Sequence, residues 1–350
     1  MMQYRSVAEL NQAVLHGLQK IPRDVDLIIG IPRSGLLPAN IMSLALNLPL
    51  ADLDGFCAGR ILSAGKTRRK APNPDTSAYR KILVVDDSIS SGEAMKQARQ
   101  RISEVDDSPD RFLFCAVYGT AEDNPEADIV LERVPTPRVF EWNLMHHPVL
   151  VRSCVDIDGV LCIDPTDAEN DDGPLYSLFL GNARPLYTPG FRIGHLVTSR
   201  LEKYRAETER WLEMRGIQYD KLWMLDLPNA EERRRRGAHG QFKAQIYAQL
   251  ETDLFIESED AQAMEIARLS GKPVLSIETQ SIVYPDNLLD HAARRRRYVQ
   301  RRAEARALNQ TRFAPVVKSA LQRVLPAGHF ERLVQWRRAK RRERQMAAKS

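Results

Sequence analysis

Short apolar runs alternate with amphipathic stretches over most of the chain. Residues 26–31 (DLIIGI), 82–85 (ILVV) and 112–118 (FLFCAVY) are apolar runs with the length and composition of buried strands. Residues 4–20 and 36–46 instead repeat their apolar side chains at helical intervals. Strands that alternate with helices predict an α/β fold built on parallel sheets, with the functional site at the carboxyl ends of the strands.

The apolar run 82–85 ends in two carboxylates, Asp86 and Asp87, and a serine-rich loop. The loop residues are Ser88, Ile89, Ser90, Ser91 and Gly92, and a helical pattern resumes directly after them. Such a loop directs backbone N–H groups at one point, which the dipole of the following helix makes attractive to an anion. The two carboxylates can accept hydrogen bonds from ribose hydroxyls or hold Mg2+. We therefore expect a site for a phosphorylated ribose; the simpler alternative is an ordinary turn with exposed acids.

The same pattern resembles the phosphoribosyl pyrophosphate (PRPP) signature of type I phosphoribosyltransferases. The resemblance implies that Asp86 and Asp87 hold the ribose hydroxyls and that the loop from Ser88 to Gly92 cradles the 5-phosphate. It also implies a loop for the pyrophosphate of PRPP after the first core strand, formed here by Arg33, Ser34 and Gly35. Ala94 stands where many members of the family have threonine.

Two other segments are expected to complete this first site. Residues 60–80 are polar and carry four closely spaced basic side chains, Lys66, Arg68, Arg69 and Lys70. We interpret them as a flap that closes over pyrophosphate and excludes water, the alternative being a solvated surface loop. Residues 121–148 should contribute the acceptor side, for which Trp142, His146 and His147 are candidates. An aromatic residue and two histidines at a domain junction explain that segment equally well.

A second pair of carboxylates, Asp156 and Asp158, follows the apolar start of the run 154–161 (CVDIDGVL). Acids two residues apart project to the same side of an extended segment. This DxDGV pattern resembles the first motif of phosphatases of the haloacid dehalogenase (HAD) superfamily. The resemblance implies that Asp156 attacks phosphorus, that Asp158 acts as general acid and base, and that Mg2+ is required because one anion must approach another.

Later residues match the remaining motifs of that superfamily in their order. The resemblance implies that Thr198, at the end of a strand, binds a phosphoryl oxygen and that Lys243 neutralises the phosphate. Metal ligands would be Asp156 and Asp158 together with Glu257 and Asp260, and Glu259 is a further possibility. Glu257 stands where aspartate is more usual. The short, Gly- and Pro-rich segment before Thr198 has room for a flap but not for a full cap domain, which suits a phosphate on a bulky substrate.

Charge separates the chain into a body and a tail. Residues 291–350 hold 18 Lys and Arg against 3 Asp and Glu, whereas residues 1–290 hold 33 against 43. The tail also carries an apolar stripe with aromatic residues, which favours binding to an anionic membrane surface. Nucleic-acid binding is the less favoured interpretation, and packing against the body remains open for residues 292–325. We expect three parts: a phosphoribosyltransferase-like domain (1–148), a HAD-like phosphatase domain with a minimal cap (149–285) and a basic helical tail (286–350).

Other features exclude several classes of protein. No run approaches the roughly 20 apolar residues of a membrane span, and the N-terminus has no apolar signal core. The four cysteines show no paired spacing, which is typical of reduced thiols in a cytosolic protein. The expected location is therefore the cytoplasm, at the inner face of the plasma membrane.

The two resemblances together predict a bifunctional enzyme. Transfer from PRPP leaves a 5-phosphate on the product, and a fused phosphatase can remove it. The pairing is similar to the two-step route to ribofuranose in bacterial surface polysaccharides, which implies PRPP and a lipid-linked glycan acceptor as partners. The alternatives are a nucleobase phosphoribosyltransferase fused to a phosphatase, and a PRPP-sensing nucleic-acid binder. The sequence leaves open the acceptor sugar, the linkage, the oligomeric state and the base that activates the acceptor.

Overall fold

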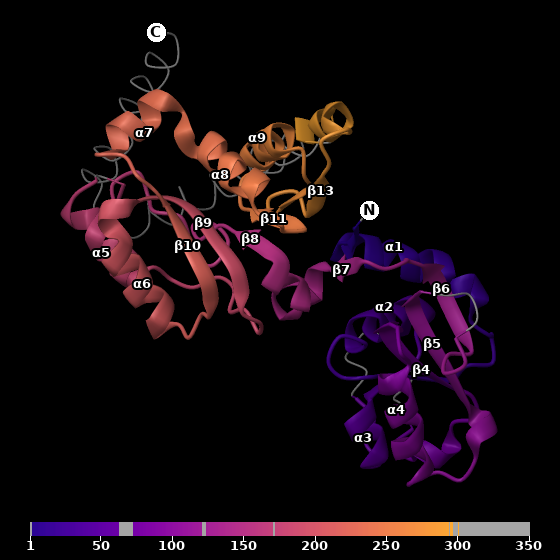
Figure 1. Ribbon diagram of the computed structural model, residues 1–350. Helices are drawn as coiled ribbons and strands as arrows, with labels where there is room; N and C mark the ends of the chain where they lie inside the picture. Colours follow the sequence, from indigo (N-terminus) through magenta and orange to yellow (C-terminus); the bar gives the residue numbers. More distant parts are fainter. Residues whose placement is uncertain are drawn as a thin grey trace, which may run out of the picture. The chain divides into compact units, whose positions relative to one another are not determined.

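The computed structural model describes residues 2–62, 73–120, 124–170, 172–293, 295, 296 and 300 of the 350-residue chain. Its first compact unit is Met1–Asp286. The first unit contains two large, mainly parallel sheets (Figure 1) and a third sheet of two strands. The four basic residues of the expected flap and nearly all of the expected basic tail lie outside the described residues. Within the described part, no helix is long and apolar enough to cross a membrane.

The first sheet has five strands, all parallel, in the order β3-β2-β4-β5-β6. Its strands are β2 (Leu27–Gly30), β3 (Leu50–Asp52), β4 (Ile82–Ser88), β5 (Phe112–Gly119) and β6 (Ile129–Arg133). The helices around it are α1 (Val7–Gly17), α2 (Leu36–Leu46), α3 (Leu53–Cys57) and α4 (Glu93–Ser103). Because β2 lies between β3 and β4, the direction in which the chain adds strands reverses at β2 and β4, which makes their carboxyl ends a switch point of the topology.

Alternating side chains of these strands form two cores, one on each face of the first sheet. Ile28, Leu83 and Val85 pack on one face with residues of α1 and α2. Ile29 and Val84 pack on the other face with residues of α3 and α4. A strand buried on both faces must be apolar at nearly every position, which explains the continuous apolar runs in the sequence.

The second sheet has six strands in the order β10-β9-β8-β11-β12-β13, and only β13 is antiparallel to its neighbour. Its strands are β8 (Ser153–Val155), β9 (Ile193–Leu201), β10 (Tyr219–Leu225), β11 (Leu254–Glu257), β12 (Val274–Ser276) and β13 (Ser281–Val283). Strands added on one side of β8 are followed by strands on its other side, so β8 and β11 flank the switch point of this sheet. The carboxyl ends of these two strands lead into Asp156 and contain Glu257.

Five helices accompany the second sheet, and they are α5 (Pro174–Asn182), α6 (Arg205–Met214), α7 (Ala230–Arg236), α8 (Ala238–Gln249) and α9 (Asp260–Ser270). Helices α5 and α6 pack together and share a core with one face of the sheet (Figure 1). Tyr247 of α8 packs edge-on against Phe255 of β11, at a ring-centroid distance of 5.5 Å. In the described residues between β8 and β9, α5 is the only α-helix, so the inserted segment is small.

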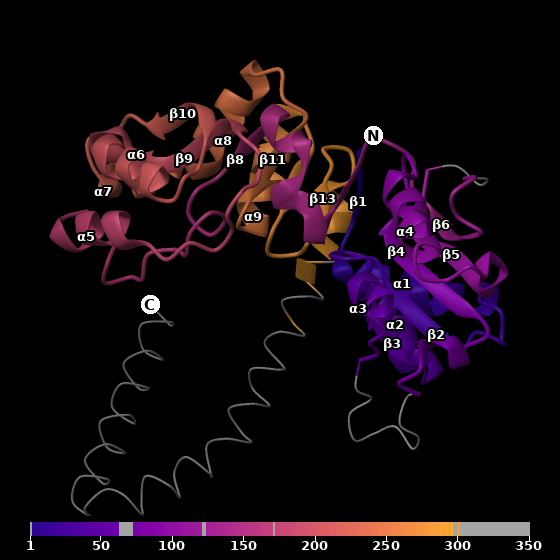
Figure 2. The same ribbon diagram turned by 90° about the horizontal axis from the view of Figure 1, so that it is seen from below.

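The N-terminal residues form a strand that the sequence did not predict. Strand β1 (Gln3–Arg5) pairs in parallel with β7 (Arg138–Phe140), and it lies beside β13 (Figures 1 and 2). The Tyr4 hydroxyl donates to Gln280 Oε1 at 2.6 Å. Helix α1 begins only at Val7 because Ser6 and Glu9 form a reciprocal capping box. The expected helix over residues 4–20 is therefore shorter at its N-terminal end.

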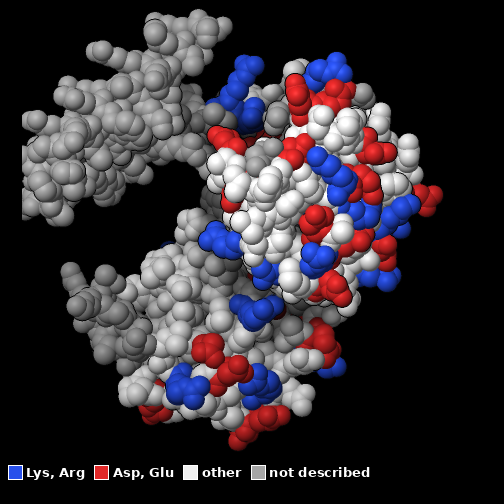
Figure 3. All heavy atoms as spheres, turned by 90° about the vertical axis from the view of Figure 1, so that its left-hand side faces the viewer, with Lys and Arg blue, Asp and Glu red and all other residues white. Residues whose placement is uncertain are grey.

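The α/β class with parallel sheets, predicted from alternating strands and helices, is confirmed. All four cysteines are free. Charged side chains of both signs are interspersed over the described part of the face shown in Figure 3, so that face carries no extended field of one sign.

Strand β4 continues past the apolar run to Ser88, because Asp86 and Ser88 pair with Ala116 and Tyr118 of β5. The first two carboxylates are thus held within a strand instead of a loop.

Candidate functional site

The predicted pyrophosphate loop and the Asp86-Asp87 pair meet at the switch point of the first sheet. The neighbouring strands β2 and β4 place the ends of both segments side by side, with Gly30 paired to Val85. Gly35 approaches this edge so closely that a Cβ atom there would lie 2.9 Å from Asp86 Oδ1 and 2.6 Å from the Val85 carbonyl oxygen. Only glycine allows this approach without displacing backbone. Arg33 is exposed and Ser34 partly exposed on the same loop.

Asp86 and Asp87 are both buried, with 7% and 3% of their surface exposed. Asp86 Oδ1 accepts a hydrogen bond from the backbone N–H of Asp87 at 2.9 Å. Burial and, to a lesser degree, the adjacent Asp87 raise the pKa of Asp86 to about 8. A carboxyl group in this state favours partners that stabilise its negative charge, such as hydroxyl donors or a divalent cation.

Trp142 donates its indole N–H to Asp87 Oδ2 at 2.8 Å. Trp142 stacks on Phe140, and Phe140 stacks on Tyr118, with ring-centroid distances of 5.0 and 5.4 Å. The ladder of rings fixes the indole plane, so the hydrogen bond to Asp87 is held in one geometry. The sequence placed Trp142 among the acceptor candidates; the structure places it on the predicted ribose site.

The loop from Ser88 to Gly92 is fixed at both ends. Ile89 is buried and its N–H donates to the Tyr118 carbonyl at 2.8 Å. Gly92 has φ +85 and caps the N-terminus of α4, a conformation that glycine adopts without strain. The buried guanidinium of Arg138 donates to the Ile89 carbonyl at 2.7 Å. Ser90 and Ser91 remain exposed between these anchors, where an anion could reach them.

The two histidines predicted as acceptor candidates lie differently. His147 Nδ1 accepts a hydrogen bond from the backbone N–H of Val149 at 3.1 Å and caps the short helix η5 (Pro148–Arg152). Burial lowers the pKa of His147. These observations describe a histidine that stabilises a turn. His146 ends the short helix η4 (Glu141–His146), and its role as an acceptor ligand stays a prediction.

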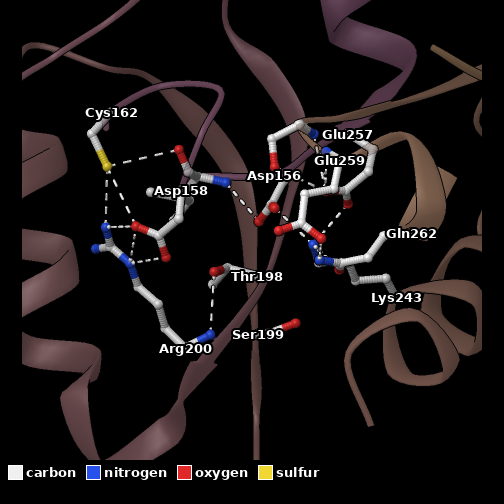
Figure 4. Close-up of polar contacts among 12 residues, drawn as sticks. Asp156, Asp158, Cys162, Thr198, Ser199, Arg200, Lys243, Glu257, Glu259 and Gln262 are labelled. Carbon is white, nitrogen blue, oxygen red and sulfur yellow. Dashed lines mark hydrogen bonds and ion pairs between the residues drawn. The ribbon is translucent and has the colours of Figure 1, made fainter. Parts of the chain in front are cut away.

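In the second sheet, one ammonium group lies between two buried carboxylates. Lys243 Nζ is 2.7 Å from Asp156 Oδ2 and 2.7 Å from Glu257 Oε2 (Figure 4). The three residues come from α8, from the end of β8 and from β11, so they converge at the switch point. Burial lowers the pKa of Lys243, but the two carboxylates outweigh this and raise it above its ordinary value. Lys243 is therefore held as a cation, and Gln262 Oε1 accepts a further bond from it at 3.2 Å.

Asp158 forms a separate ion pair with the buried side chain of Arg200. Arg200 Nη2 lies 2.6 Å from Asp158 Oδ1, and its Nε lies 3.0 Å from Asp158 Oδ2. The Cys162 thiol completes this cluster, 3.4 Å from Asp158 Oδ1 (Figure 4). Burial acts to raise the pKa of Asp158, but Arg200 outweighs it and lowers the pKa below its ordinary value. Asp158 is thus held as an anion.

The remaining predicted residues of this site are buried but are not all directed at one another. Thr198 Oγ1 accepts from the Arg200 backbone N–H at 3.3 Å. Asp260 Oδ1 accepts from Thr279 Oγ1 at 2.8 Å. Among the described residues, no three His, Cys, Asp or Glu side chains are grouped as a metal-binding set. The predicted set of four ligands is therefore not assembled here, because Asp158 faces Arg200 and Asp260 faces Thr279.

The two carboxylates beside Lys243 are nevertheless suitable ligands for Mg2+. Asp156 and Glu257 direct carboxylate oxygens at a single positive point, and hard oxygen ligands are those that Mg2+ prefers. These two residues would hold the ion. Its binding stays a prediction, as does the role of Asp158 and Asp260 as ligands.

Two contacts of these sites were not predicted from the sequence, namely those of Arg200 with Asp158 and of Trp142 with Asp87. The signal for Arg200 was its spacing: it follows Thr198 by two residues, so the two side chains lie on the same face of the strand. No such local signal exists for Trp142, because its partner Asp87 lies far away in the sequence.

Comparison with known proteins identifies one region of the chain. Residues 4–149 match the family described as "Phosphoribosyl transferase domain", and the predicted phosphoribosyltransferase domain is confirmed at this level. The match does not extend into the second sheet, whose assignment stays a prediction. A search of curated proteins finds no match.

Solved structures similar to the chain include two phosphoribosyltransferases. A purine phosphoribosyltransferase from Pyrococcus horikoshii Ot3 has a TM-score of 0.29 and 19% identity, covering 40% of this chain and 93% of that one. The Helicobacter pylori xanthine-guanine-hypoxanthine phosphoribosyltransferase has a TM-score of 0.30 and 19% identity, covering 42% of this chain and 99% of that one.

Proposed function

We propose that the chain is a bifunctional enzyme that transfers 5-phosphoribosyl from PRPP to a glycan acceptor and then removes the 5-phosphate. One observation carries the proposal: each of the two parallel sheets has a pair of buried acids at its switch point, Asp86 with Asp87 and Asp156 with Glu257. Ligands of open α/β sheets bind at such points. Two independent sites in one chain favour two consecutive reactions on one substrate.

The family match over residues 4–149 supports a transferase that uses PRPP. In the proposed complex, Asp86 and Asp87 accept hydrogen bonds from the ribose hydroxyls, and the indole of Trp142 keeps Asp87 in position. The exposed part of the Ser88–Gly92 loop, at the N-terminus of α4, binds the 5-phosphate. The loop at Gly35 lies against Asp86 and is suited to the pyrophosphate group that leaves.

The second site is suited to cleavage of a phosphate monoester through an aspartyl phosphate. An oxygen of Asp156 bonds to phosphorus while the bond from phosphorus to the sugar oxygen breaks. The sugar oxygen then takes up a proton and leaves as a hydroxyl group. Water then attacks phosphorus, gives up a proton and releases Asp156 and inorganic phosphate. Lys243 offsets the negative charge of Asp156 as the phosphate approaches, and a bound Mg2+ would further reduce the repulsion between the two anions.

Asp158 is better suited to one half of its predicted role than to the other. The ion pair with Arg200 keeps the pKa of Asp158 low, so the side chain can accept the proton of the attacking water. Donation to the sugar oxygen requires a protonated carboxyl group, which the same ion pair opposes. We therefore assign Asp158 mainly to the hydrolysis of the aspartyl phosphate.

The order of the two reactions suggests the substrate class. A nucleotide is retained in the cell by its phosphate, so a fused phosphatase would work against nucleobase salvage. Attachment of plain ribofuranose to a larger acceptor needs both steps. The small insertion between β8 and β9, with α5 as its only α-helix among the described residues, suits a phosphate carried on a bulky glycan, including a lipid-linked one. Binding of the tail to an anionic membrane would bring the enzyme to such an acceptor.

The test is product analysis with the full chain, PRPP, Mg2+ and a panel of glycan acceptors. The wild type should add the mass of ribose without phosphate, and Asp156→Asn should accumulate the phosphorylated product. Asp253→Asn is the matched control, because Asp253 is exposed and pairs only with exposed Arg152 among the described side chains. Consumption of a nucleobase, or addition of ribose by Asp156→Asn without phosphate, would contradict the proposal.

A further inference from the structure

Three basic side chains are buried in the described part of the second sheet's domain: Arg200, Arg233 and Lys243. Arg200 pairs with Asp158, and Lys243 pairs with Asp156 and Glu257. Arg233, which is 6% exposed, has no carboxylate within ion-pair distance among the described residues. Among the described residues, Arg233 therefore differs from the other two cations in having no negative partner.

In the described part of the chain, the guanidinium of Arg233 is held by neutral oxygens. Its Nη1 donates to the Ser199 carbonyl at 2.9 Å, and its Nη2 approaches Asn170 Oδ1 at 3.4 Å. Tyr176 of α5 is a further hydrogen-bond neighbour. The Nε group is buried and has no hydrogen-bond partner among the described residues. The side chain is positioned by these contacts, but one of its donors and its full charge remain unsatisfied.

A second unsatisfied donor lies next to Arg233. The Ser199 hydroxyl is buried without a hydrogen-bond partner in the described part of the chain, and Ser199 directly follows Thr198. Burying a cation without a compensating anion costs several kcal/mol, and an unmade hydrogen bond adds to this cost. Such an arrangement is retained most readily where an anionic ligand supplies the missing partner.

The charge of Arg233 acts at the same place as the site already described. Burial, then Arg233, then Lys243 lower the pKa of half-buried His239 to about 4. Tyr176 is likewise within electrostatic reach of Asp158, Arg200 and Arg233. By its contacts, Arg233 joins Ser199, the residue after Thr198 on β9, to Asn170 of the inserted segment.

We propose that Arg233, assisted by the Ser199 hydroxyl, binds the phosphate group of the monoester at the Asp156 site. This assignment rests on the proposed phosphatase function and deepens it. The guanidinium supplies a positive charge that no carboxylate of the described chain neutralises, and a phosphate oxygen accepts from Nε. Asn170 and Tyr176 of the inserted segment contact Arg233, so a phosphate bound there would lie beside that segment.

The experiment is titration of the full chain with inorganic phosphate, followed by isothermal calorimetry and by the phosphate-dependent rise in Tm. Arg233→Gln removes the charge, and we expect the phosphate Kd to rise about ten-fold or more. Arg233→Lys keeps the positive charge but loses the planar guanidinium with its several N–H donors. We expect its affinity for phosphate to lie between those of the wild type and Arg233→Gln. Arg235→Gln is the matched control, because Arg235 lies on the same helix but is 72% exposed and pairs with Glu232.

The outcomes separate this assignment from the proposed function. If Arg233→Gln and Arg235→Gln both bind phosphate as the wild type does, the assignment is overturned even if the wild type hydrolyses p-nitrophenyl phosphate. If the wild type hydrolyses no monoester but Arg233→Gln alone loses phosphate binding, the phosphatase proposal fails and the anion site stands. If Arg233→Gln does not fold, Arg233→Lys decides, because an unchanged Kd and KM in that variant contradict a role for the guanidinium fork.

Discussion

The two switch points have the same topology but opposite charge balance. At the first, Asp86 and Asp87 are buried together, and in the described part of the chain neither forms an ion pair; an indole N–H is the one side-chain donor recorded for Asp87. At the second, Lys243 and Arg200 already partner the acids. The first site depends on its ligand to stabilise its charge, whereas the second is largely neutralised before any ligand arrives.

This difference separates their responses to substitution. Removing an acid relieves repulsion at the first site, but removing a cation creates repulsion at the second. The pKa of Asp86 is raised to about 8 mainly by burial, and burial likewise raises the pKa of Asp156, whereas Arg200 lowers the pKa of Asp158.

The largest expected effect tests whether the two sites act independently. Asp156→Asn removes the proposed nucleophile, and we expect phosphate release to fall by about 10^4-fold or more. Transfer from PRPP should change less than two-fold. Separate assays of pyrophosphate and phosphate release measure both steps. Equal loss in the two assays would show that the sites are not independent.

The next effect tests the charge balance of the second site. Lys243→Met leaves Asp156 and Glu257 facing each other in a buried position, and we expect a loss of about 3 to 5 kcal/mol in the free energy of unfolding. Urea denaturation at pH 7 measures it. Lys221→Met, at an exposed position of β10, is the control. If the free energy of unfolding of Lys243→Met falls by less than about 1 kcal/mol, the lysine is not needed to stabilise Asp156 and Glu257 in their buried positions.

At the first site the corresponding substitution should stabilise the protein. Because the pKa of Asp86 is raised to about 8, the folded state keeps a proton that an unfolded aspartate loses at about pH 3.9. Stability contributed by this group therefore falls as pH rises between these values. Asp86→Asn cannot ionise, so it should exceed the wild type by about 2 to 4 kcal/mol at pH 9 and match it near pH 4. Equal stability of the two proteins at both pH values would rule out the raised pKa.

The smallest effect concerns the donor to Asp87. Trp142→Phe keeps a ring on the aromatic ladder and removes the indole N–H. A hydrogen bond to a charged group contributes about 1.5 kcal/mol or more, so the Kd for PRPP should rise roughly ten-fold. Calorimetry with PRPP measures it. Tyr118→Phe, which leaves the Asp87 hydrogen bond intact, should bind PRPP as the wild type does; if both variants weaken binding equally, the ladder and not the hydrogen bond is responsible.

Patterns within short segments predicted more than patterns between them. Continuous apolar runs predicted the buried parallel strands, and acids at the ends of 82–85 and of β8 marked the two sheet edges at which we propose that ligands bind. The sequence could not show that Arg200 crosses to Asp158 or that Trp142 reaches Asp87, because such pairs depend on which strands become neighbours. The sequence likewise could not show that the Asp260 carboxylate accepts a hydrogen bond from Thr279 Oγ1; its role as a metal ligand stays a prediction.

Strand β1 affects the order in which the chain can fold during translation. Its ladder partner β7 leaves the ribosome only after the whole first sheet, and Gln280, the partner of Tyr4, follows after nearly all of the second. The first sheet does not include β1, so it can fold while residues 3–5 are still unpaired. Strand β1 can therefore pair with β7 before the second sheet is made, and a nascent chain that stalls before residue 280 would carry this pairing without the hydrogen bond from Tyr4 to Gln280.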